Sequence, residues 1–296
     1  MRVSTSSFSE QGIEDGISYA KRASYARMDW GRLREKVHLA QMPTAVLGFL
    51  IVSLVVLVAV SGAATVQRRV SVQVRKTHTT GLGQIQGALA AMFGVIVGFS
   101  AFFVLNKYHT ALDTVQTEAA DVVEIYRLSE PLPEAKQEPV QSLAASYARV
   151  VVEVEWPMMR QGKRSPRADA LIRELRGSIQ EGYRTSTGTE QDFFGEQLGV
   201  MDDLESDREA RLVILRQRLP LILWIALIVV GILLVGFSYM IGMESRLLHL
   251  LAIGAMAGGI ALVLFTIAEL DQPFGMNPRV TPEPFELVLQ EMEGNR

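Results

Sequence analysis

The sequence predicts an all-α integral membrane protein with four transmembrane helices and a helical extramembrane bundle inserted between the second and third spans. Three observations lead to this fold class. Hydrophobic residues make up 49% of the chain and charged residues 21%, and the two kinds are segregated along it. Four stretches hold no Asp, Glu, Lys or Arg, and each has about the 20 residues that a helix needs to cross a bilayer core. The segment between the second and third stretches has the periodicity of amphipathic helices.

The four uncharged stretches are residues 43–66, 84–105, 219–243 and 247–268. A soluble α/β protein can also bury apolar helices, but these are usually shorter and alternate with strands. The first stretch begins too far from Met1, and is too long, for the apolar core of a cleavable signal peptide. We therefore expect a multi-pass membrane protein whose first partner is the lipid bilayer.

The spans divide the chain into five parts. We expect a polar, disordered leader at 1–41, a first transmembrane hairpin at 42–106, an extramembrane helical domain at 107–218, a second transmembrane hairpin at 219–270 and a C-terminal tail at 271–296. Met1 and Met42 are both candidate start residues, and the sequence leaves this choice open.

Basic residues near the span ends predict the orientation. An even number of spans places both termini on the same side as residues 107–218. That side carries Arg27, Arg32, Arg34, Lys36, Lys107, Arg208, Arg211, Arg216, Arg218 and Arg279, whereas the other side carries only Arg68, Arg69, Arg75, Lys76 and Arg246. The positive-inside rule therefore predicts cytoplasmic termini and a cytoplasmic helical domain. We expect the membrane to be a bacterial plasma membrane.

Apolar spacing predicts several helices in the extramembrane domain. Apolar residues recur three and four apart from Tyr108 to Leu128, so this helix is expected to continue directly from the second span. Three prolines within residues 129–139 suit a turn and a helix start. Further apolar stripes follow at 143–158, 168–181 and 189–217, and the last is expected to lead directly into the third span. The predicted unit is a helical bundle with two helices continuous with spans.

The stretch VVVEVEW, residues 150–156, raises the choice between a strand and a helix. A strand would place Glu153 and Glu155 on one face, as a candidate metal site or acid–base pair. The stripe continues at helical spacing on both sides, which favours a helix, and in a helix the two carboxylates lie about 200° apart. Glu155 is then expected to be a solvated surface carboxylate, with a position facing a partner helix as the alternative.

The polar residues form no recognisable catalytic or metal-binding motif. Residues 81–87, GLGQIQG, lack both the spacing of a dinucleotide loop and a preceding strand. The histidines, His38, His78, His109 and His249, are scattered, no serine lies in a GxSxG elbow, and the chain has no cysteine. The net charge of −3 gives no reason to expect nucleic acid. We predict no enzyme activity, cofactor, metal or nucleic-acid partner.

Small residues in two spans suggest close helix packing. Gly94 and Gly98 form a GxxxG motif in the second span, and Gly254 and Gly258 form another in the fourth. This spacing lets backbones approach closely, either within one subunit or between subunits of a homo-oligomer.

Three aromatic residues follow in the second span. Phe99, Phe102 and Phe103 either face lipid or form an apolar constriction of a pore. No charged residue lies at mid-membrane, so coupled transport through buried carboxylates has no candidate residue. A hydrophobically gated pathway remains open.

Four segments, taken in order, resemble the bestrophin-like domain family of bacterial and plant membrane proteins. They are THTTGLGQIQGALAAMFGVIVGFSAFFVLNKY, EAADVVEIYRLSEPLPE, SYARVVVEVEWP and ELDQPFGMNPRVTPEPF. The resemblance runs from about Met42 to Leu289. Residues matching positions expected to be characteristic are His78, Glu118, Glu155, Trp156, Asp271, Pro273 and Phe274. Gln272 replaces the family's usual arginine, which puts an ion pair at that position in doubt.

The resemblance implies a plan similar to that of bestrophins, which are pentameric anion channels with four spans and a cytoplasmic helical region. The chain has no bestrophin pore signature and no acidic calcium clasp. Two hypotheses follow. The protein is an oligomeric ion channel lined by the second span, or it is a membrane-anchored sensing or scaffolding module that binds a cytoplasmic protein through residues 131–218.

Overall fold

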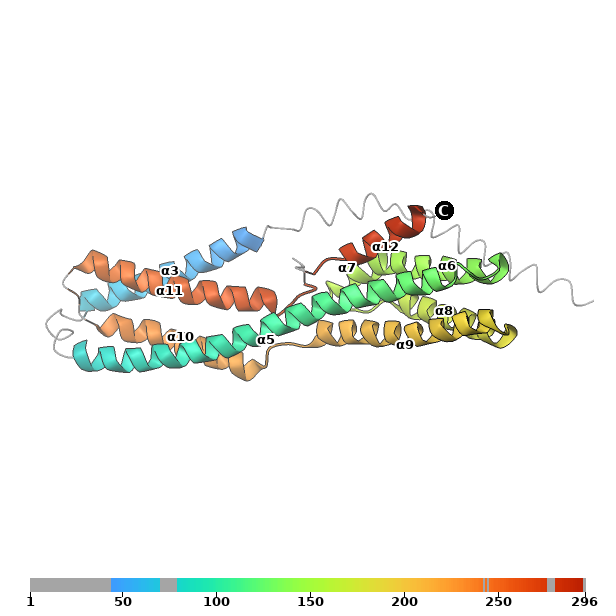
Figure 1. Cartoon of the computed structure of the whole chain (residues 1–296). Helices are drawn as coiled ribbons and strands as arrows, with labels where there is room; N and C mark the ends of the chain where they lie inside the picture. Colours follow the sequence, from blue (N-terminus) through green and yellow to red (C-terminus); the bar gives the residue numbers. More distant parts are fainter. Residues whose placement is uncertain (1–43, 70–78, 242, 244, 276–279, 295–296) are drawn as a thin grey trace, which may run out of the picture. The chain divides into compact units, whose positions relative to one another are not determined.

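The structure, a computed structural model, describes residues 44–69, 79–241, 243, 245–275 and 280–294. All of these except Thr44 belong to one compact unit, Ala45–Arg296. Every regular element among the described residues is helical (Figure 1), which confirms the predicted all-α class. The predicted leader 1–41 lies outside the described residues, and so does His78.

The predicted spans lie in four helices: α3 (Thr44–Arg69), α5 (Thr79–Leu128), α10 (Leu221–Met240) and α11 (Arg246–Leu270). Among the described residues, these four regions are long and apolar enough to cross a membrane. Large side chains such as Phe49, Leu221 and Leu247 are exposed along them. Helices that are apolar on all sides suit hydrocarbon rather than water.

The helix α5 continues from the second span into the extramembrane bundle without a break (Figure 1). It has 50 residues, and at 1.5 Å per residue it is about 75 Å long. From Ser100 to Leu128 it contains neither glycine nor proline, so nothing in the sequence interrupts its hydrogen-bond ladder. This confirms the expected continuity of the second span.

The expected continuity of the third span is wrong. The helix α9 (Thr189–Arg216) ends before the third apolar helix begins, and Gln217–Pro220 form a non-helical connection to α10. Pro220 has no N–H to donate, and its ring disfavours helical backbone at the residue before it. Pro220 itself has φ −53° and ψ 135°, so it lies just outside α10.

The extramembrane bundle packs α5 and α9 with α6 (Glu134–Val150), α7 (Trp156–Met159) and α8 (Pro166–Thr185) around one apolar core. The helix α12 (Glu283–Gly294), from the segment expected to be a C-terminal tail, packs against α5 and α6 (Figure 1). It buries Phe285, Val288 and Met292. The end of the chain therefore contributes to the bundle core.

Candidate functional site

Glu155, expected at the surface, is fully buried. The VVVEVEW stretch is helical as predicted, but residues Val151–Glu155 form a π-helical turn. Such a turn inserts extra backbone into a helix and is frequent at functional sites. Glu155 lies in the core while Glu153 is exposed. The surface expectation is wrong because apolar spacing within one helix does not show which cations neighbouring helices supply.

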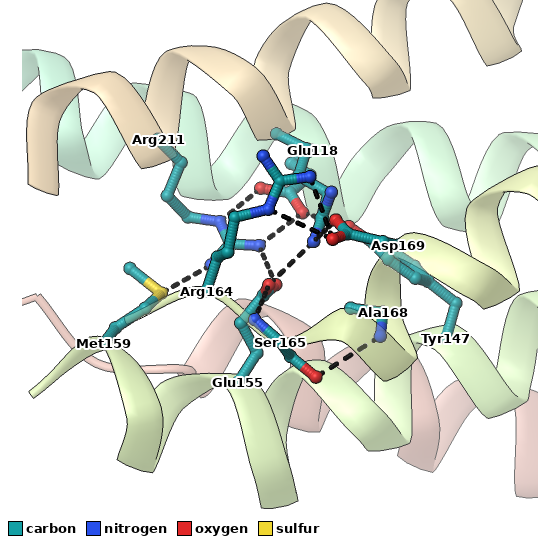
Figure 2. Close-up of polar contacts among 10 residues, drawn as sticks. Glu118, Tyr147, Glu155, Met159, Arg164, Ser165, Ala168, Asp169 and Arg211 are labelled. Atoms are coloured by element: carbon teal, nitrogen blue, oxygen red, sulfur yellow. Dashed lines mark hydrogen bonds and ion pairs between the residues drawn. The ribbon is translucent and has the colours of Figure 1, made fainter. Parts of the chain in front are cut away.

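Arg211, from α9, is the centre of a buried ion network (Figure 2). Its Nε donates to Glu118 Oε2 at 2.6 Å and its Nη2 to Glu118 Oε1 at 2.9 Å, so the pair is bidentate. The same Nη2 donates to Glu155 Oε2 at 2.8 Å. One guanidinium group thereby joins α5, α9 and the π-helical turn.

A second guanidinium group extends the network toward α8. Arg208 Nη2 donates to Glu155 Oε1 at 2.7 Å and lies 2.8 Å from Asp169 Oδ1. Arg164, which is more exposed, donates through Nε to Asp169 Oδ2 at 3.0 Å. Three carboxylates thus face three guanidinium groups, and their formal charges cancel. Because each buried charge has an opposite charge beside it, the cost of removing these groups from water is offset.

Two neutral donors complete the network. Tyr147 Oη donates to Glu118 Oε1 at 2.5 Å, and the backbone N–H of Ser165 donates to Glu155 Oε1 at 3.1 Å (Figure 2). The hydroxyl of Ser165 also caps α8 by accepting the N–H of Ala168. Burial and the neighbouring Glu118 raise the pKa of Tyr147 well above its ordinary value, so it remains a phenol that donates.

The main ions of the network remain charged at neutral pH. Burial alone would raise the pKa of Glu155, but Arg211 and Arg208 outweigh it and hold that pKa below its usual range. Burial likewise opposes the charge of Arg211, yet Glu118 raises the pKa of Arg211 well above its usual value. The ion pair of Arg211 with Glu155 holds α9 against the π-helical turn.

Aromatic contacts link the network to the segment after the fourth span. The Cζ atom of Arg211 lies 5.6 Å from the centroid of the Trp156 ring, within the range of a cation–π contact. Trp156 in turn meets Phe274 edge to face, with ring centroids 5.7 Å apart. Phe274 is buried and follows Pro273, whose carbonyl accepts the N–H of Val280.

A second buried ion pair lies where the apolar helices meet the extramembrane bundle. Lys107 Nζ donates to Asp271 Oδ1 at 3.2 Å and to the backbone carbonyls of Asp271 and Gln217. Asp271 Oδ1 also accepts the N–H of Leu219 at 2.9 Å. Asp271 thereby satisfies an amide in the break between α9 and α10, and holds that break beside α5.

The structure therefore groups the family-matching residues around two sites. Glu118, Glu155, Trp156 and Phe274 lie around Arg211, while Asp271 and Pro273 lie at the junction with the spans. The sequence prediction missed the cations, Lys107, Arg208 and Arg211. A signal for the last two exists in α9, where they interrupt an apolar stripe that includes Leu204, Leu212 and Leu215.

The residues predicted in the spans have different surroundings. A Cβ atom added at Gly254 or Gly258 would meet valines of α3 at 3.4 Å and 3.2 Å, so this GxxxG motif packs within the chain. Gly94 and Gly98 have open space on that side among the described residues. Phe99 is 70% exposed and Phe102 66% exposed, and Phe103 is exposed as well.

No group of His, Asp or Glu side chains in the described part of the chain is arranged to hold a metal ion. The chemistry of the two sites is instead that of buried ion pairs at helix crossings. A four-span helical membrane protein with an ion-paired extramembrane bundle is thus the class that fold and site define.

The model of the bestrophin-like domain matches residues 53–285. The chain therefore belongs to the bestrophin-like family, as its sequence segments predicted, and the match includes both ion sites. Neither a curated protein nor a solved structure matches the chain.

Proposed function

We propose that the protein is the subunit of a homo-oligomeric ion channel whose pore is lined by residues 84–105 of α5. The observation that supports this proposal is a face of α5 that packs against no other described helix. One face of the span, with Phe93 and Val104, packs with residues of α10 such as Leu227. The opposite face carries the open glycines and exposed phenylalanines described above.

An exposed row of glycines suits a second helix better than it suits lipid. Gly94 and Gly98 offer little surface to acyl chains, but they let another backbone approach closely. Phe99, Phe102 and Phe103 lie next to them in a stretch without charge, as expected of an apolar constriction that closes by dewetting. We further propose that the channel conducts anions, because the chain resembles bestrophins, which are anion channels.

The same helix connects the pore to the extramembrane bundle. Since α5 is continuous, a displacement of Glu118 relative to Arg211 is transmitted to the span. We therefore propose that the channel opens when α9 moves against α5. The extramembrane bundle is proposed to lie on the cytoplasmic side of the membrane.

Ion flux through liposomes containing the purified full-length chain tests the proposal. Phe102→Ala is expected to raise chloride flux several-fold, because it widens the apolar constriction. The matched control is Phe49→Ala in α3, which removes an equally exposed ring, 72% accessible, from another span. Absence of flux from protein shown to be oligomeric would count against the channel.

A specific observation favours the alternative, a module that binds a cytoplasmic protein. An open apolar hollow of about 550 Å³ lies where α5 ends and α9 begins, lined by Val123, Leu128, Pro131 and Phe193 among others. Photo-crosslinking in cells from a probe at Phe193 is expected to capture one partner, with a probe at exposed Glu174 as the control. A chain that crosslinks to nothing from Phe193 contradicts this alternative.

A further inference from the structure

A small cavity lies where the extramembrane bundle meets the ends of the third and fourth spans. It is lined by Met159, Arg160, Gly162, Leu215, Arg218 and the segment Gln272–Gly275. Arg218 directly precedes the uncharged stretch 219–243, and Gln272 comes just after α11 ends at Leu270. The cavity therefore lies at the level where two spans leave the hydrocarbon, which is the level of the lipid phosphates.

Two arginines, Arg160 and Arg218, line this cavity, and neither forms an ion pair with a carboxylate among the described residues. Arg160 forms no ion pair with any described residue, and its buried Nε has no hydrogen-bond partner among them. Among the described residues, Arg218 Nη1 has one hydrogen-bond partner, the backbone carbonyl of Asp271 at 3.4 Å. Oδ1 of Asp271 is already engaged by Lys107 and by the N–H of Leu219, and neither oxygen of Asp271 forms an ion pair with Arg218 among the described contacts.

The size and lining of the cavity suit a compact oxyanion. About 20 Å³ is free for the centre of a water-sized group, far below the several hundred Å³ of a pocket for a large organic ligand. Guanidinium groups match phosphate oxygens with paired N–H donors. An unsatisfied buried N–H of a charged side chain is costly, and an anion would satisfy it.

We infer that this cavity binds a phosphate group through Arg160 and Arg218. The group is the headgroup phosphate of an anionic phospholipid or a free phosphate ion, since both present the same chemistry. Binding joins the end of α7 to the start of α10, next to Phe274 and its contact with Trp156. The inference goes beyond the channel proposal and does not depend on it.

The test uses the full-length chain, purified in detergent and stripped of lipid. Separate samples receive short-chain phosphatidylglycerol or inorganic phosphate, and binding is measured by native mass spectrometry and by the unfolding temperature. Arg160→Gln and Arg218→Gln are each expected to weaken binding roughly tenfold or more, because each removes charged hydrogen bonds. Arg216→Gln is the matched control, since Arg216 ends α9 at the same level but does not line the cavity.

The outcomes separate the two sources. Binding of phosphatidylglycerol that the two cavity variants lose and the control keeps assigns the site to lipid, and the same pattern with inorganic phosphate alone assigns it to a free ion. Equal binding by the wild type and all three variants overturns the inference, as does an absence of binding in both samples. If Arg160→Gln fails to fold, Arg218→Gln still decides the test, because the side chain of Arg218 is exposed.

Discussion

The two helical bundles share α5, yet their interiors are built differently. The extramembrane bundle has one large apolar core, and its central polar groups are ions held in pairs around Arg211. Among the described residues, the spans have two smaller buried clusters, and hydrogen bonds between side chains, rather than ion pairs, join the helices there. Gln86 donates to Ser238 at 2.6 Å, and Gln67 Nε2 lies 3.0 Å from His249 Nδ1.

The difference follows from the solvent of each bundle. Water drives apolar side chains together in the extramembrane bundle, and the resulting burial tolerates ions that neutralise one another. Lipid gives no such drive between spans, so these associate through small residues and neutral hydrogen bonds. Much of the apolar surface of α5 and α10 is consequently left for lipid or for further subunits. Four predictions test this contrast, from the largest expected effect to the smallest.

Removing the central cation should have the largest effect. Arg211→Met keeps most of the side-chain volume but leaves Glu118 and Glu155 buried without their shared partner. Breaking a buried ion pair in this way costs about 3–5 kcal/mol. The free energy of unfolding in detergent, measured by denaturant titration, should fall by this amount, or the chain should not accumulate.

A matched substitution separates burial from charge. Arg127→Met removes an exposed ion pair with Glu291, and exposed pairs of this kind contribute under about 1 kcal/mol. Adding Glu118→Gln and Glu155→Gln to Arg211→Met should recover part of the lost stability, since no carboxylate then lies buried alone. Equal losses for Arg127→Met and Arg211→Met would contradict the contrast between the two bundles.

Why the sequence predicted the spans but not this network is clear from particular residues. A span is a local property, because 22 consecutive uncharged residues, 84–105, leave few alternatives to a membrane helix. Helix continuity through α5 is local too, since no breaker interrupts it. Pro220 is also a local feature of the sequence. Because proline disfavours helical backbone at the residue before it, Pro220 could have predicted the break between α9 and α10.

The ion network depends on contacts between distant segments. Glu118 and Arg211 are 93 residues apart in sequence, and the orientation of Glu155 depends on a π-helical turn that no spacing rule predicts. The resemblance of the sequence segments to the bestrophin-like family did indicate that Glu118, Glu155 and Asp271 occupy characteristic positions of that family. It carried no information on which cation each of them meets.

The junction between the bundles should be the next most sensitive position. Asp271→Asn retains an oxygen that can accept from Lys107 and from the N–H of Leu219, but removes the negative charge. Loss of a charged hydrogen bond at a buried pair costs about 1.5–3 kcal/mol. A double-mutant cycle with Asp271→Asn and Lys107→Met, followed by thermal unfolding, measures the interaction between the two side chains. The double variant should lose less stability than the sum of the two single losses, because both substitutions remove the same ion pair.

A neutral pair within the spans provides the comparison. Gln86→Leu removes the hydrogen bond to Ser238, and interhelical hydrogen bonds in membranes contribute about 0.6 kcal/mol on average. A loss for Gln86→Leu as large as that for Asp271→Asn would show that ionic and neutral contacts support the two regions equally.

Two glycines test the packing difference directly. A Cβ atom at Gly182 would overlap the ring of buried Phe194, whereas one at Gly98 meets nothing within 4 Å among the described residues. Gly182→Ala should therefore destabilise by about 1–3 kcal/mol through overpacking. In monomeric protein Gly98→Ala should change stability by under about 0.5 kcal/mol or raise it slightly, because alanine favours helix. If Gly98→Ala weakens an oligomer, the open face of α5 is a subunit interface, which sharpens the channel proposal.

The smallest effect concerns Asp121, a half-buried residue in the extramembrane part of α5 that forms no ion pair with any described residue. Burial, together with the like charges of Asp207, Asp203 and other acidic neighbours, raises the pKa of Asp121 to about 7. The folded state therefore holds a proton that the unfolded state releases near pH 4, so stability falls as pH rises from about 4 to 7 and stays level above.

Asp121→Asn imitates the protonated form and should remove this penalty. After allowance for solvent screening, the gain in unfolding free energy should be about 1 kcal/mol at pH 8, and it should shrink as the pH falls toward 4. The exposed Glu174→Gln serves as the control, with no comparable dependence on pH. Thermal unfolding at pH 8 and pH 5 measures the difference in stability between the variant and the wild type. If Asp121→Asn is no more stable than the wild type at pH 8, the charge of Asp121 does not destabilise the folded state. This part of α5 would then differ from the face of α5 toward Arg211, where the charges are paired. The extramembrane bundle would then tolerate unpaired ions, and pairing could no longer explain why its interior differs from that of the spans.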